Sequence, residues 1–170
     1  SHFELYFETM VCAGAIKSPK DLYWYIRPNI EFGTIEFRIC DAGNSVQEIM
    51  AIVAFIQNLV EMVDRDSSRW KWDQRQHWIA TENHWVAARD GLDGVITTGT
   101  TVVKRQVAEE VYWLIDELAP IARSLNNYDE LLYLKTILKQ GNGAMRQRKV
   151  FKETRDLSQV VKMCAEECRL

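Results

Sequence analysis

Residues 32–41 run Phe-Gly-Thr-Ile-Glu-Phe-Arg-Ile-Cys-Asp, and this stretch alternates cleanly between two kinds of side chain. Ile35, Phe37 and Ile39 alternate with side chains of a different kind. Successive side chains of a β-strand point to opposite faces, so this alternation predicts a strand with one apolar face. The residues predicted on its other face are Thr34, Glu36, Arg38 and Cys40.

The segment that precedes this strand predicts a second one. Asp21 to Arg27 encloses Leu-Tyr-Trp-Tyr-Ile, which is aromatic and β-branched, and Pro28-Asn29 ends it. A short connection to Gly33 favours an antiparallel hairpin over residues 21–41. Two strands alone make a poor sheet. We therefore expect further strands from a longer chain or from a partner, such as a second copy in a homo-oligomer.

Helical patterns dominate the rest of the chain. Ser45 followed by Glu48 predicts a capping box and a helix to about Asp64, apolar on so many sides that we expect it to be largely buried. Other helices are predicted over 3–11, 81–89, 107–125, 129–140 and 144–152, with a last one capped by Asp156 and carrying Val160, Val161 and Cys164 inward. A small hairpin is predicted over 95–105. The predicted fold class is α+β, a hairpin of an antiparallel sheet with a large C-terminal helical portion.

Composition limits the classes of function. The chain has 170 residues, 47% hydrophobic, with a formal net charge of −3, so it can form one real core and has no field that favours nucleic acid. The sequence has no run of about 18 apolar residues, so no membrane span is expected. The first residues do not show the basic-then-apolar pattern of a signal peptide. The four cysteines form no disulfide framework. Reduced thiols and a cytoplasmic location are the expectation.

The polar face of the strand over 34–40 carries the candidate site. Glu36 and Arg38 leave the same face about 6.5–7 Å apart, and Tyr25 and Arg27 share a face of the preceding strand. A carboxylate can hold Mg²⁺ while a guanidinium clamps phosphate oxygens. The alternative is a solvated sheet face with a cross-strand ion pair.

Three other groups of residues favour plain structural roles. Cys164 and Cys168 lie four residues apart without a histidine at ligand spacing, so two ordinary thiols are expected. A basic cluster of Arg146, Arg148 and Lys149 is typical of a solvated helix face rather than of a phosphate site. The tryptophans favour packing over stacking on a ligand base; they are Trp70, Trp72, Trp78 and Trp85.

Five sequence blocks in order resemble one family. They are Tyr-Trp-Tyr-Ile-Arg-Pro (23–28), Phe-Gly-Thr-Ile-Glu-Phe-Arg-Ile-Cys-Asp (32–41), Glu-Asn-His-Trp-Val-Ala-Ala-Arg-Asp-Gly-Leu-Asp (82–93), Leu-Ala-Pro (118–120) and Gly-Asn-Gly-Ala-Met-Arg-Gln-Arg (141–148). The first two resemble "W-x-I-R-P" and "G-T-I-E-x-R-x-x-D" of the carboxylate–amine ligases similar to glutamate–cysteine ligase. The other three resemble "E-N-R-W-x-A-x-R-Y-G-L-D", "L-x-P" and "G-x-G-A-x-x-Q-R" of the same family.

This resemblance implies a fold, a reaction and roles for residues. The implied fold is like glutamine synthetase, with ATP and Mg²⁺ on the inner face of a curved antiparallel sheet. Glu36 would be a metal ligand and Arg38 the catalytic clamp on the transferred phosphoryl group. ATP or substrate would be contacted by Arg27, with Tyr25 on the same face, and by Asn83 and Arg89. The implied reaction joins a carboxylate to an amine through an acyl phosphate, with glutamate and cysteine as first choices.

The chain also departs from the family pattern. Family chains are about twice as long and carry a Glu-x-Glu metal motif that is absent here. The chain is therefore expected to be one domain, or the C-terminal half of a longer catalytic domain, and inactive by itself. His84 and Asp90 stand where the family has Arg and Tyr. The alternative is a helical interaction module or decayed ligase remnant without activity, in which Glu36 and Arg38 pair and leave no cavity.

Overall fold

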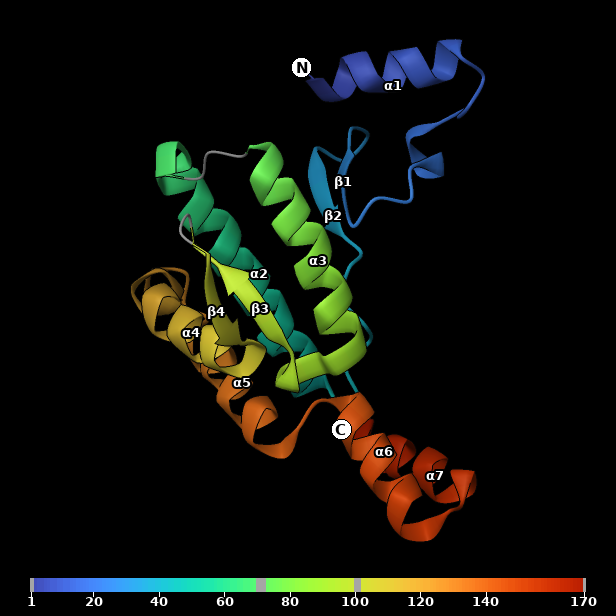
Figure 1. Ribbon diagram of the computed structural model, residues 1–170, viewed down its shortest axis with the longest axis vertical. Helices are drawn as coiled ribbons and strands as arrows, with labels where there is room; N and C mark the ends of the chain where they lie inside the picture. The colour runs from blue at the N-terminus through green and yellow to red at the C-terminus, as the bar shows by residue number, and fades with distance from the viewer. Residues whose placement is uncertain (1, 70–72, 100–101, 170) are drawn as a thin grey trace. The chain divides into compact units, whose positions relative to one another are not determined.

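The computed structural model describes residues 2–69, 73–99 and 102–169 (Figure 1). The chain divides into two compact units, Ser1–Ala42 and Gly43–Leu170. Trp70 and Trp72, and residues 100 and 101 of the second predicted hairpin, lie outside the described residues.

The first unit is a helix followed by a hairpin. Its elements are α1 (His2–Cys12), the 3₁₀ turn η1 (Pro19–Asp21), β1 (Ile26–Asn29) and β2 (Thr34–Phe37). The strands are antiparallel, with Arg27 opposite Glu36 and Pro28 opposite Ile35. Phe3 and Tyr6 of α1 lie 5.8 and 5.0 Å from the ring of Trp24, measured between ring centroids. Aromatic contact therefore holds α1 beside the chain that enters the hairpin.

The hairpin is confirmed but shorter than predicted. The expected first strand over Asp21–Arg27 is wrong in its bounds, because Ser18 and Asp21 form a capping box that turns residues 19–21 into η1. Pro28, expected to end the strand, lies inside β1. A proline has no N–H for a ladder and is tolerated on an edge strand, and β1 is an edge in this two-stranded sheet.

The second unit is mostly helical. It contains α2 (Val46–Arg65), η2 (Ser67–Arg69), α3 (Gln74–Asp90), η3 (Gly91–Asp93), β3 (Val95–Thr98), β4 (Val103–Gln106), α4 (Val107–Ser124), α5 (Tyr128–Gln140), α6 (Gly143–Thr154) and α7 (Leu157–Glu167). Helices α2, α4 and α5 pack together, α3 lies on the β3–β4 hairpin, and α6 packs on α7 (Figure 1). Helices with small antiparallel sheets confirm the α+β class. The larger curved sheet implied by the resemblance stays a prediction.

The core of this unit is small. It lies between α2, α4 and α5, and its most buried residues are Ala51, Ile115, Leu118, Ala122 and Leu131, each 0% exposed. Leu22 is buried in the other unit. Burial of apolar area at this three-helix junction is the main force that holds the unit together.

Local signals set most helix ends. The side chains of Ser45 and Asp156 accept hydrogen bonds from Glu48 N and Ser158 N at the starts of α2 and α7. Gly91 (φ +60°) and Gly141 (φ +86°) end α3 and α5 with a positive φ, a backbone conformation that residues other than glycine rarely adopt. The predictions of these starts and stops are confirmed.

Three details of the helix predictions are wrong. Helix α3 begins at Gln74, because Asp73 and Gln76 form a capping box and Thr81 lies within the helix. Val161, expected inward on α7, is 68% exposed. The capping box at Ser45 is only half formed, since the Glu48 carboxylate accepts from Asn44 N instead of from the Ser45 backbone.

The expected burial of α2 on most sides is also wrong. Only Glu48, Ala51, Ala54 and Asn58 are buried on this helix, and six of its apolar side chains are 41–45% exposed: Val46, Ile49, Met50, Val53, Val60 and Val63. Within the described residues α2 is the one helix long and apolar enough to cross a membrane by length and composition, a test that core helices also pass. The sequence expectation of no such segment is corrected to that extent.

Candidate functional site

The polar face of the β1–β2 hairpin brings three predicted site residues together. Arg27 and Glu36 face each other across the ladder. Arg27 Nε and Nη2 donate to the same oxygen, Glu36 Oε2, at 3.0 and 2.5 Å. On the other side Arg38 Nε lies 3.7 Å from Glu36 Oε1. One carboxylate therefore lies between two guanidinium groups, and the cluster carries a net positive charge.

Arg27 is bound on all sides by its own unit. Its Nη1 donates to Lys20 O at 3.0 Å and lies 3.5 Å from the carbonyl oxygens of Pro19 and Leu22. Its side chain is 12% exposed. With every donor nitrogen engaged, Arg27 fastens η1 to the hairpin and orients the Glu36 carboxylate.

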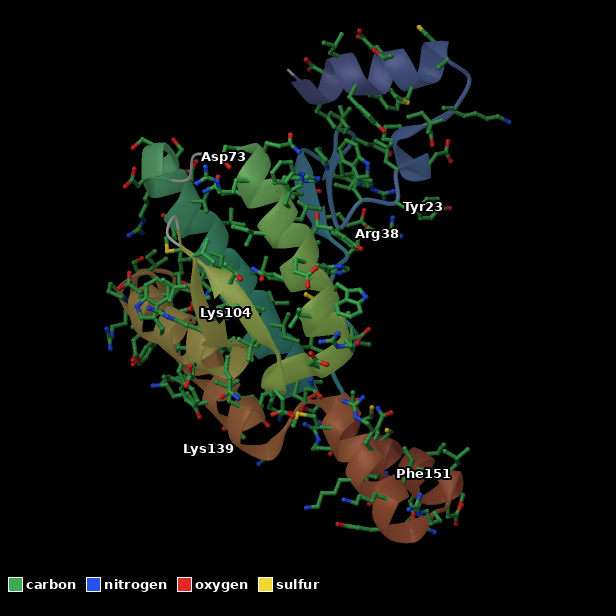
Figure 2. The ribbon with its side chains drawn as sticks, viewed as in Figure 1. Tyr23, Arg38, Asp73, Lys104, Lys139 and Phe151 are labelled. Atoms are coloured by element: carbon green, nitrogen blue, oxygen red, sulfur yellow. The ribbon has the colours of Figure 1, made fainter. Side chains whose placement is uncertain are left out.

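Arg38 is held more loosely and remains accessible. It follows β2, where its N–H donates to Tyr25 O at 2.8 Å and extends the ladder by one pair. Its guanidinium lies 5.7 Å from the centroid of the Tyr23 ring, and Figure 2 shows the two side chains beside each other. With its side chain 35% exposed, Arg38 can still bind an anion from solvent.

The described residues alone do not form a magnesium site. Among them no group of three His, Cys, Asp or Glu side chains could hold a metal ion. Glu36 offers one carboxylate, and its Oε2 already accepts twice from Arg27. Mg²⁺ is bound through one or two carboxylates together with water and phosphate oxygens. Glu36 can thus supply one ligand of such a site. Cys164 and Cys168 are free thiols, as expected.

A pocket of about 560 Å³ lies beside this cluster within the same unit. Lys20, Arg27, Asn29 and Glu31 contribute polar groups to its lining, and Pro19, Pro28 and Ile30 contribute apolar surface. Tyr25, which lies just before β1, is 54% exposed. The hairpin therefore combines a cationic cluster with an open cavity.

Asn83 lies in the other unit and binds a strand. Its Oδ1 accepts from Thr97 N at 2.8 Å, and its Nδ2 donates to Thr97 O at 2.7 Å. The amide thus acts as the partner that a neighbouring strand would provide, and it fastens α3 to β3. A role in ligand binding stays a prediction.

Arg89 forms a local pair on the surface of α3. Its Nε and Nη2 donate to the two carboxylate oxygens of Asp90 at 2.7 and 2.6 Å, and its guanidinium lies 4.0 Å from the Trp85 ring centroid. The hydrogen bonds from Arg89 hold the pKa of Asp90 below its ordinary value. Trp85 and Trp78 are 54% and 64% exposed, so neither lies in the core, and packing against another subunit stays a prediction.

Sequence reasoning missed a second ion cluster. Arg146 Nη2 donates to Glu48 Oε1 at 2.6 Å, and its Nε and Nη2 donate to Glu167 at 2.8 and 2.9 Å. Asn44 Nδ2 donates to the same Glu167 carboxylate at 2.7 Å. These bonds, with Arg146 first, hold the pKa of Glu167 below its ordinary value. The expected solvated basic face is wrong for Arg146, which is 16% exposed. Sequence separations of 98 and 21 residues left no local signal.

Comparison with known proteins agrees with these motifs. The family model "Glutamate-cysteine ligase family 2 (GCS2)" matches residues 1–163. Relatives provisionally named glutamate–cysteine ligase 2 are 35% identical in Frankia casuarinae over 97% of this chain, and 37% identical in Solibacter usitatus and Bordetella parapertussis over 98%. This chain spans 44%, 44% and 40% of those relatives, less than half of each. On the family match over nearly its whole length, the chain belongs to glutamate–cysteine ligase family 2.

Proposed function

We propose that this chain supplies part of the active site of an ATP-dependent carboxylate–amine ligase that joins glutamate to cysteine. The observation that carries the proposal is the Arg27–Glu36–Arg38 cluster on the polar face of the hairpin. The cluster carries excess positive charge, and Arg38, the more exposed of its two guanidinium groups, can bind a phosphoryl group. Family membership supports a ligase.

The proposed reaction has two steps. A carboxylate oxygen of glutamate attacks the γ-phosphorus of ATP, the bond to the β-phosphate oxygen breaks, and ADP leaves. The amine of cysteine then attacks the acyl carbon, inorganic phosphate leaves with the electron pair of the broken C–O bond, and the nitrogen loses a proton. Both steps spread negative charge over phosphate oxygens, where a fixed guanidinium is most stabilising.

The proposed roles follow from how each residue is held. Arg38 is the catalytic residue that clamps the transferred phosphoryl group, and Glu36 supplies one ligand for the Mg²⁺ that accompanies ATP. Arg27 and Tyr25 border the nucleotide or substrate, with Arg27 also fixing Glu36. A role in binding ATP or substrate is proposed for Asn83 and Arg89 as well, on the family motif that carries them. A reaction that consumes ATP and a free thiol suits the cytoplasm.

One observation favours the non-enzymatic alternative. Glu36 is already paired with Arg27 and lies 3.7 Å from Arg38, which is the ion pairing expected of an inert remnant. The alternative also expects that Glu36 and Arg38 leave no cavity. The pocket of about 560 Å³ on the same hairpin is lined by Arg27 but by neither Glu36 nor Arg38, so it does not argue against the alternative.

The test is an isotope-transfer assay. Glutamate labelled with ¹⁸O in its side-chain carboxylate is incubated with ATP, Mg²⁺ and cysteine, and released phosphate is analysed by mass spectrometry. We expect no product from the 170-residue chain alone. With the remaining part of a family chain added, we expect one ¹⁸O per phosphate. Labelled phosphate from the chain alone, abolished by Arg38→Ala, would contradict the incomplete site. Unlabelled phosphate from the complemented protein would contradict the acyl phosphate.

A further inference from the structure

Helix α2 has two apolar faces, and only one of them is packed. Ala51, Ala54 and Asn58 are at most 2% exposed, on the face that packs against α4 and α5. Positions three, four and seven apart share a helix face. The opposite face consists of Val46, Ile49, Met50, Val53 and Val60, which are 41–45% exposed. We call these five residues the outer α2 face.

The outer α2 face has the composition of an interface centre. Its five residues are all aliphatic or methionine, and the centre of a protein interface is depleted of charged residues and more apolar than its rim. This face is therefore suited to the dry centre of an interface.

The opposite side of α2 argues against lipid as the occupant. Glu48 on that side accepts from Arg146 and Asn44, and Asn58 donates to Asn127 Oδ1 at 2.9 Å. Insertion into a bilayer would break these bonds and leave a carboxylate and an amide in hydrocarbon, which costs several kcal/mol per group. Helix α2 is therefore anchored in the protein core and offers only its outer side.

The length of the relatives identifies the occupant. In each of the three compared relatives the stretch similar to this chain is joined to more than half of a longer polypeptide. A linked segment is present at an effective concentration in the millimolar range, so it covers an apolar face ahead of a second copy that must be recruited from solution.

We infer that the outer α2 face is the docking surface for the part of the ligase family chain that this sequence does not contain. The occupant is that polypeptide, linked to this chain as the corresponding parts of the relatives are linked. It covers the aliphatic side chains of α2 and removes them from water. The inference depends on family membership and concerns binding alone, so it holds or fails independently of the proposed reaction.

The test is co-purification with matched variants. The non-overlapping parts of the Frankia casuarinae, Solibacter usitatus and Bordetella parapertussis relatives are each tagged and co-expressed with this chain. Val53→Lys places a charge at the centre of the outer α2 face, and Val161→Lys makes the same change at an exposed position on α7. We expect a 1:1 complex whose Kd rises at least about tenfold with Val53→Lys and stays unchanged with Val161→Lys.

Four results would overturn the inference. The first is no complex with any of the three partners, and the second is a complex indifferent to Val53→Lys. The third is a chain that dimerises alone in sedimentation and becomes monomeric with Val53→Lys, which would assign the face to a second copy. The fourth is a fall in the thermal midpoint of the isolated chain with Val53→Lys but not Val161→Lys, which would assign the face to internal packing.

Discussion

The two ion clusters of this chain have opposite compositions. Arg27, Glu36 and Arg38 set one carboxylate between two guanidinium groups, while Glu48, Arg146 and Glu167 set one guanidinium between two carboxylates. The first retains a third of the Arg38 side chain in solvent. In the second, Arg146 and Glu48 are only 16% and 10% exposed.

This difference distinguishes a candidate binding site from an ion cluster that only stabilises the fold. In the Arg146 cluster the guanidinium donates to both carboxylates and to Gly141 O at 2.6 Å, so its donors are used within the fold. In the hairpin cluster Arg27 satisfies Glu36 and leaves Arg38 in excess. An unmatched, accessible guanidinium attracts an anion, whereas a saturated one holds elements together. Substitutions in the hairpin cluster should therefore lower activity, and substitutions in the Arg146 cluster should lower stability.

The largest effect expected is on catalysis. Arg38→Ala in the complemented ligase should lower kcat/KM by about 10²–10³-fold, because it removes a guanidinium from the developing phosphate charge. The thermal midpoint should barely change, since an exposed ion pair contributes at most about 1 kcal/mol. Steady-state ADP release measures the first quantity and calorimetry the second. Arg75→Ala, at an exposed position on α3, is the control. An equal fall in kcat/KM with Arg38→Ala and with Arg75→Ala would contradict a specific role of the hairpin cluster in catalysis.

The next effect is on stability. Arg146→Met leaves the carboxylates of Glu48 and Glu167 without their shared cation, so unfolding free energy should fall by about 2–3 kcal/mol. Urea unfolding of the 170-residue chain measures it. Lys149→Met removes the same charge from an exposed position of the same helix and should cost under about 0.5 kcal/mol. Similar losses in the two variants would show that Arg146 acts only through net charge.

Substitution of Asn83 tests whether its side-chain amide has a structural role, a ligand-binding role or both. Asn83→Ala leaves Thr97 N and O without their side-chain partner and should lower stability by about 1–2 kcal/mol. Thr81→Ala, at an exposed position on the same helix, is the reference for urea unfolding. A nucleotide-binding role adds a weaker affinity for ATP in the complemented ligase, measured by calorimetry. Unchanged stability combined with unchanged ATP affinity would contradict both roles.

The smallest effect expected is a pH dependence. The pKa of Glu167 is lowered from its ordinary value of 4.5 when the chain folds, because Arg146 and Asn44 donate to its charged form. The stabilisation is therefore present at neutral pH and is lost as pH falls below about 4.5 through the folded pKa. Glu167→Gln should be less stable at pH 7 and lose less on acidification to pH 3.5. If urea unfolding shows that both proteins lose the same free energy of unfolding between pH 7 and pH 3.5, the prediction is contradicted.

Local sequence signals predicted most of the helical elements. Ser45 and Asp156 cap helices as expected, and Gly91 and Gly141 end them, because a cap needs only backbone groups a few residues away. Thr81 is a residue type that often caps helices, but it lies within α3, where its hydroxyl donates to His77 O. The hairpin and the face shared by Arg27, Glu36 and Arg38 also follow from strand alternation.

Strand periodicity, capping and motif blocks are properties of neighbouring residues, so the α+β class, the family and the residues of the hairpin cluster follow from the sequence alone. The contacts of those residues follow from the folded chain. There Arg27 pairs with Glu36, Arg146 pairs with two distant carboxylates, and one face of α2 packs on the core. The Arg146 cluster brings together residues up to 123 positions apart, and the energy that selects such contacts comes from packing and desolvation, which no local pattern encodes.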